Sequence, residues 1–287
     1  MKMLDRMRAW STATRWSIIG ALGLTCIVVT VNLGPISQPQ SYHDFADART
    51  WLGIPRAWDV LSNLPFILVG AFGLYFALRQ RSSLTAQQRR AYGTLFAGLM
   101  LTGFGSGYYH LAPDNDRLVA DRLPMTVAMA GIICALIVDR FRAKTLWLLP
   151  VLIVLGLGSV LQWNWSEQHG HGDLRWYALY QGLVMVVGVL LLLLFPSRAP
   201  GTREFVIATI GNVAAKVFEL LDKPIYHLGG VVSGHTLKHL SAGLGFVPLV
   251  LLIARPVFSF CCPVSGVDRD ATADHGHHDH QGMACRP

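Results

Sequence analysis

Long apolar segments alternate with short polar ones along almost the entire chain. Each apolar segment is close to the roughly 20 residues that a helix needs to cross a bilayer. A backbone in lipid must satisfy its own hydrogen bonds, which favours helices. The sequence therefore predicts an all-α integral membrane protein with eight spans. The spans lie near Trp16–Leu33, Val60–Leu78, Thr94–Leu111, Leu123–Val138, Leu146–Leu161, Tyr177–Phe195, Phe205–Leu221 and Ser233–Ala254.

The composition agrees with a membrane location. Of the 287 residues, 52% are hydrophobic and 14% are charged, whereas roughly 25% of a soluble domain is charged. These values exclude a soluble globular enzyme and a disordered chain, and the net charge of +7 is then no sign of nucleic-acid binding. The five cysteines form no CxxC motif, so the sequence indicates no disulfide framework.

Two of the predicted spans allow another interpretation. The first follows a basic segment, as a signal peptide does, but no clear small-x-small cleavage site follows it, which favours an uncleaved anchor. The seventh contains Asn212, Lys216 and Glu219. Because intramembrane charges commonly pair, we interpret Lys216, Glu219 and Asp222 as an ion-pair ladder that faces the bundle, with a proton or ion path as the alternative.

Lysine and arginine predict the orientation. With the N-terminus in the cytoplasm, 16 of the 24 Lys and Arg residues fall at cytoplasmic ends and seven at outer ends, so both termini are expected inside. Trp163, Trp165 and Trp176 fit an aromatic belt at the outer interface. Seven of the 11 histidines also lie at outer ends. Neutral imidazole is the commonest metal ligand, so the outer half of the bundle is where chemistry is expected.

Ser106 and His110 lie four residues apart near the outer end of the third span, and a helix places both on one face. Asp121 follows eleven residues after His110, beyond a turn signal at 112–116 that allows it to return beside the histidine. Polar and ionisable side chains inside a membrane cost free energy, so each of these residues is a candidate for a functional role. Taken singly, Ser106 could bond to its own helix and Asp121 could be a helix N-cap.

His235 and His239 stand one helical turn apart at the outer start of the last span. Together with His110 they offer three imidazoles from two helices, which suits a zinc site whose fourth position is open to water. A lone membrane histidine is more often a helix–helix hydrogen bonder, so the hypothesis depends on all three. Zincins place a glutamate directly after the first histidine of their motif. Here that residue is Thr236, and Asp121 is the available carboxylate.

In this order and spacing, Ser106-x-x-x-His110, Asp121 and His235-x-x-x-His239 resemble the alkaline ceramidase / adiponectin-receptor (CREST) superfamily of membrane hydrolases. The likeness is closest to its bacterial ceramidase-like branch. The resemblance implies zinc on the three histidines, with Ser106 and Asp121 flanking the water that the metal activates. It also implies a seven-helix transmembrane core, preceded here by one extra N-terminal transmembrane helix.

The resemblance also divides the chain. Ser62–Phe66 is similar to the family's first core span, and the likeness covers roughly Tyr42 to Pro256. Residues 1–41 would hold an N-terminal cytoplasmic segment and the extra transmembrane helix, residues 42–256 the seven-span hydrolase core, and residues 257–287 a His-rich disordered cytoplasmic tail. Alkaline ceramidases carry a calcium site with a Trp-x-Glu-x-Asn pattern before the first core span. Residues 42–47 do not match this pattern, so calcium is not carried over.

These features predict a zinc-dependent, multi-pass membrane hydrolase with its active site near the outer face. It would cleave an amide bond in a ceramide-like or other N-acyl lipid. Asp121 would take a proton from the attacking water and pass it to the leaving amine, and Ser106 would orient the water or stabilise the oxyanion. The expected partners are a lipid substrate and the bilayer, without nucleic acid. A membrane transporter and a non-enzymatic lipid or ligand receptor are the alternatives.

Overall fold

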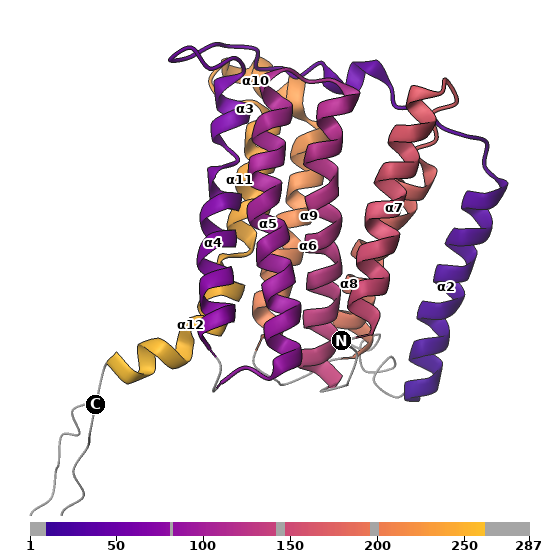
Figure 1. Ribbon diagram of the computed structural model, residues 1–287, viewed down its shortest axis with the longest axis vertical. Coiled ribbons are helices and arrows are strands. Elements are labelled where there is room, and N and C mark those ends of the chain that lie inside the picture. The colour runs from indigo at the N-terminus through magenta and orange to yellow at the C-terminus, as the bar shows by residue number, and fades with distance from the viewer. Residues whose placement is uncertain (1–9, 81–82, 142–146, 196–200, 262–287) are drawn as a thin grey trace, which may run out of the picture.

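The computed structural model describes residues 10–80, 83–141, 147–195 and 201–261, and in these ranges the chain forms helices and loops without a named β-strand (Figure 1). By length and composition, six segments could cross a membrane, so the protein is an all-helical, multi-pass membrane protein. The helices in chain order are α2 (Thr12–Asn32), the short 3-10 helix η1 (Gln40–His43), α3 (Ala57–Leu61), α4 (Leu64–Arg79), α5 (Ala86–Leu111), α6 (Asn115–Phe141), α7 (Leu148–Gln168), α8 (Arg175–Leu194), α9 (Thr202–Leu220), α10 (Asp222–Gly229), α11 (Gly234–Gly245) and α12 (Val247–Cys261).

Two of the eight predicted spans are not among these six segments. They correspond to α5 and α9, which run alongside the other long helices in Figure 1. Both contain glycine, polar and charged residues that lower their mean hydropathy, such as Asn212, Lys216 and Glu219 in α9. The number of membrane crossings therefore stays a prediction.

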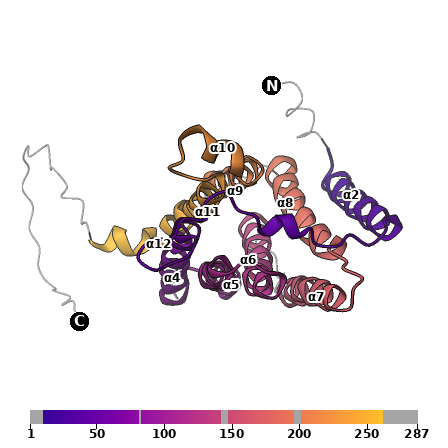
Figure 2. The ribbon, with the colours of Figure 1, turned by 90° about the horizontal axis from the view of Figure 1, so that it is seen from above.

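The long helices form a closed ring. Viewed from above in Figure 2, the ring runs through α4, α5, α6, α7, α8, α9 and α11, and α11 packs against α4 to close it. Helix α2 stands outside the ring beside α8, and Trp16 on α2 packs its ring 4.9 Å from that of Phe195. The ring encloses the space in which polar side chains of α5, α6 and α11 lie.

Glycines allow α5 and α6 to approach each other closely. A Cβ atom on Gly98 would collide with the backbone of Ala128, and one on Gly105 would collide with the carbonyl group of Ala120. Small residues at such crossings let helix backbones approach. The close crossing at Gly105 brings its neighbour Ser106 beside α6.

The turn between α5 and α6 is shorter than the sequence suggested. Helix α6 begins at Asn115, so Asp121 lies in the second turn of the helix, and its reading as an N-cap is wrong. The Asp114 carboxylate instead accepts a hydrogen bond from the backbone N–H of Arg117 at 2.7 Å. Because Asp114 satisfies a free amide of the first turn, the side chain of Asp121 is available for other contacts.

The segment 33–56, here named the crossing segment, joins α2 to α3 across the upper end of the ring (Figure 1). The backbone N–H of Gln38 donates to Glu167 at 2.6 Å, and that of Ala46 donates to Asp222 at 2.9 Å. Between them, the ring of His43 hydrogen-bonds the Tyr109 hydroxyl at 2.8 Å. These bonds hold the crossing segment over the ends of α5, α7 and α10.

Candidate metal centre

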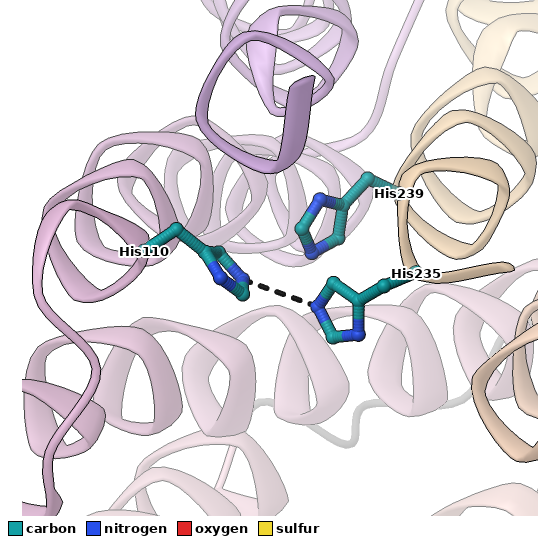
Figure 3. A group of neighbouring side chains, drawn as sticks. All are labelled: His110, His235 and His239. Carbon is teal, nitrogen blue, oxygen red and sulfur yellow. Dashed lines mark hydrogen bonds between the residues drawn. The ribbon is translucent and has the colours of Figure 1, made fainter. Parts of the chain in front are cut away.

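Three buried imidazoles lie close together, and Figure 3 shows the rings of His110, His235 and His239 pointing toward one another. The Nε2 atoms of His110 and His235 are 3.1 Å apart, and one ligand atom from each of His110, His235 and His239 lies within 4.8 Å of the others. Two nitrogens bound tetrahedrally at roughly 2.1 Å from a zinc ion would be roughly 3.4 Å apart. The spacing of the first pair is therefore close to that of ligands sharing one ion.

Two helices place these rings. His110 lies in the last turn of α5, and His235 and His239 lie one turn apart on α11, so both project from the same face. The Asp222 carboxylate accepts a hydrogen bond from the backbone N–H of His235 at 2.8 Å and so anchors the start of α11. Phe45 of the crossing segment covers the group, with its ring centroid 4.7 Å from that of His110 and 4.3 Å from that of His235.

Ser62 orients the ring of His239. Its hydroxyl donates to the backbone carbonyl of Asp59 at 3.1 Å and lies 2.8 Å from Nδ1 of His239. Because the single hydroxyl proton is used on Asp59, the oxygen accepts a hydrogen bond from Nδ1–H. This tautomer leaves the lone pair of Nε2 free to bind a metal.

The ring of His110 also carries an unsatisfied nitrogen. Its Nδ1 atom is buried and has no hydrogen-bond partner within the described part of the chain. Because Nε2 of His110 is the atom that faces His235, an ion bound there would leave Nδ1 without a partner, so Nδ1 does not itself indicate a ligand. The Nε2 atom of His239 has a free lone pair, and the Nε2 atoms of His110 and His235 face each other closely. Together with the nearly complete burial of the three rings, these features fit a transition metal such as zinc.

Ser106 and Asp121 lie beside this group. The Ser106 hydroxyl hydrogen-bonds the Asp121 carboxylate, and both side chains are buried. With His239 they line the head of a cavity of about 410 Å³. The structure thus brings all five candidate site residues to one end of the ring.

The cavity continues from this polar head into an apolar region between α6, α8 and α9. It follows α6 from Asp121 to Leu136, a distance of about 22 Å at the rise of an α-helix. Half of a bilayer's hydrocarbon core is roughly 15 Å thick, so the cavity is long enough for a long acyl chain. Its apolar lining includes Met125, Met129, Ile132, Ile133, Met185, Leu192, Phe205 and Phe246.

The predicted ion-pair ladder is correct for two of its three residues. Glu219 binds Lys216 at 2.7 Å, but its other carboxylate oxygen binds Lys238 at 2.6 Å. Asp222 is not part of the ladder, because α9 ends at Leu220 and the helical register breaks before Asp222. Its carboxylate instead binds the two backbone amides described above.

The acidic residues of 42–47 are paired with cations. Asp44 binds Lys223, and Asp47 binds Arg49 at 2.6 Å. Although burial alone would raise the pKa of the Asp47 carboxyl, its hydrogen bonds from Arg49 lower that pKa below its ordinary value. These carboxylates therefore stabilise the crossing segment as anions, and nothing in their arrangement adds support for a calcium site.

Three contributors to the site were not assigned a role from the sequence. The sequence points to Ser62 only through the family resemblance, and no motif points to Phe45 or Asp59. Asp59 is fully buried, and its Oδ1 accepts hydrogen bonds from Ser233 at 3.3 Å and Thr236 at 3.1 Å. Asp59 is a lone acid at the start of the apolar stretch that forms the second predicted span, and this position is the feature of the sequence that marks it. Nothing in the residues around Phe45 distinguishes that side chain.

A family model described as Ceramidase matches residues 54–204, which is more than half of the chain. The matched range includes Ser106, His110 and Asp121, whereas His235 and His239 lie beyond its end. No curated protein matches the chain at significant similarity.

Proposed function

The chain belongs to the ceramidase family, and from this premise we propose that it is a zinc-dependent membrane hydrolase that cleaves an amide bond in a ceramide-like or other N-acyl lipid. Family membership supports hydrolysis of lipid amides. The observation that carries the finer proposal is the convergence of His110, His235 and His239 beside Asp121, at the head of a long apolar cavity.

The proposed membrane arrangement has a seven-helix core, preceded by α2 as an extra transmembrane helix. Helix α5 has 26 residues and measures about 39 Å, so it is long enough to cross, and α9 carries Lys216 and Glu219 on the cavity wall. The excess of Lys and Arg at one end supports cytoplasmic termini and a site near the outer face. The core would comprise residues 42–256. Residues 1–9 and 262–287, which include most of the proposed cytoplasmic tail, lie outside the described residues.

In this proposal His110, His235 and His239 hold the metal, whose chemistry is to polarise a carbonyl and to activate water. Asp121 accepts the proton of the attacking water and passes it to the nitrogen of the leaving amine. Ser106 holds the Asp121 carboxylate in place and offers a hydroxyl to the oxygen on which charge develops. The apolar cavity holds the acyl chain, so that the amide lies at its polar head.

A panel of N-acyl lipids, incubated with the purified protein with and without a metal chelator, tests this proposal. We expect release of free fatty acid that the chelator stops and that added zinc restores, because the attacking water depends on the metal for its activation. Mass spectrometry of the released acids is the measurement. Lipid binding without fatty-acid release would favour a receptor, and protonophore-sensitive transport in liposomes would favour a transporter.

Ser62→Ala should weaken metal binding without removing it. The substitution takes away the acceptor that fixes the tautomer of His239, and loss of such a supporting partner typically costs 10–100-fold in metal affinity. Competition against a chromogenic chelator measures the change. Ser241→Ala is the matched control, since the Ser241 hydroxyl bonds only to the carbonyl of Lys238 in the contacts described. Equal affinities in the two variants would contradict the role of Ser62.

A further inference from the structure

Arg122 is a cation held at the head of the cavity, with 4% of its surface exposed. Its guanidinium carbon lies 4.2 Å from the ring centroid of Trp163, 4.7 Å from that of Tyr177 and 5.6 Å from that of Tyr42. Its Nη2 donates to Oε1 of Gln38 at 2.6 Å. The burial of Trp163 in this contact also means that its assignment to the aromatic belt is wrong. These neutral partners fix the position of the guanidinium but supply no negative charge.

Among the described residues, the Nη1 end of the guanidinium has no hydrogen-bond partner. Nη1 of Arg122 is buried without a hydrogen bond, and among the described residues no ion pair joins Arg122 to a carboxylate. The neighbouring Asp121 interacts with Arg122 through its charge and with Ser106 through a hydrogen bond, but it does not bond to Nη1. A buried charged donor is strongly unfavourable unless it is paired, so the position of Nη1 points to a ligand that supplies the missing acceptor.

The charges on the cavity wall favour an anion. Arg122, Lys216 and Lys238 contribute three positive side chains, and Asp121 and Glu219 contribute two negative ones. Glu219 is shared by the two lysines, so it does not neutralise Arg122. The head of the cavity therefore carries an excess of positive charge even before a metal is counted.

Resting on the proposed hydrolase function, we propose that the lipid substrate carries an anionic group, a phosphate or a carboxylate, on the polar side of its amide, and that Arg122 binds this group. A guanidinium matches the oxygens of phosphate and carboxylate, with charge-assisted hydrogen bonds that are stronger than neutral ones. A neutral lipid of the same shape leaves Nη1 unpaired. Such a lipid is disfavoured, because a site built to pair a polar group discriminates against an analogue that lacks it.

The test compares the affinity of the full-length protein for three lipids with one acyl chain length: ceramide, ceramide 1-phosphate and the free fatty acid. Native mass spectrometry counts bound lipid whether or not it is cleaved. We expect ceramide 1-phosphate to bind about 10- to 100-fold more tightly than ceramide. Arg122→Gln should lose most of this preference, and Arg122→Lys should keep part of it. Arg117→Gln is the matched control, because Arg117 lies on the same helix and does not line the cavity.

Several results would overturn the inference. The first is that the natural protein binds ceramide and ceramide 1-phosphate with equal affinity. The second and third are that Arg122→Gln leaves the preference unchanged, or that it weakens the binding of both lipids equally. The fourth is that only the binding of the fatty acid depends on Arg122. If Arg122→Gln does not fold, the comparison of the natural protein with Arg122→Lys decides. Hydrolysis of ceramide without a preference for the phosphate would sink this inference and leave the proposed function standing. A preference for the phosphate without hydrolysis of any lipid would support the binding role of Arg122 and contradict the proposed hydrolase function.

Discussion

His239→Ala should remove the metal and the hydrolytic activity together. His239 offers a free Nε2 lone pair because Ser62 occupies its Nδ1, so its loss takes away a direct ligand. The loss of affinity should exceed the 10- to 100-fold that a supporting partner contributes. Elemental analysis should find about one zinc per chain in the natural protein, as a three-histidine catalytic site requires, and a small fraction of that in the variant.

His169→Ala is the matched control for this experiment. His169 lies in the loop after α7, is exposed, and bonds through Nδ1 to the carbonyl of Trp165. We expect this variant to keep both its zinc and its activity. His239→Gln, which fills more of the vacated space, separates loss of a ligand from loss of packing. A His239→Ala protein that elutes normally and keeps a full complement of zinc would show that His239 is not a ligand.

The helices were predictable where apolar residues run without interruption. The predicted spans at Val60–Leu78 and Leu123–Val138 overlap α4 and α6, because burial in lipid requires such runs. Helix α5 was harder to delimit, because it begins at Ala86, eight residues before the predicted start at Thr94. Its first turns contain Gln88 and Arg89, and the Thr85–Gln88 capping box that starts the helix is polar.

The site was predictable only within each helix. A spacing of four residues already places Ser106 with His110, and His235 with His239, on common faces. Their meeting depends on closure of the ring by α11, a contact between distant parts of the chain that no local pattern encodes. The surroundings of Arg122 were not predictable for the same reason, since its aromatic contacts come from α7, α8 and the crossing segment.

Asp121→Asn should keep the metal and lose turnover. Asp121 is not one of the three imidazole ligands, and an asparagine can still accept the hydrogen bond from Ser106. The amide cannot take the proton of the attacking water. Because general acid–base catalysis contributes typically 10²–10⁴-fold, we expect kcat to fall by about that factor. Zinc content and initial rates of fatty-acid release, measured on the same preparation, are the two readouts.

Asp116→Asn controls for the loss of a carboxylate near the start of α6. Asp116 is exposed, and its carboxylate accepts a hydrogen bond from Gln168 at 3.4 Å, so its variant should retain both zinc and turnover. Unchanged turnover in Asp121→Asn would remove Asp121 from the chemistry. Loss of zinc in that variant would instead make Asp121 part of what holds the metal. Retained zinc with lost turnover is the combination that a proton-transfer role requires, because such a role separates the carboxylate that moves the proton from the imidazoles that bind the ion.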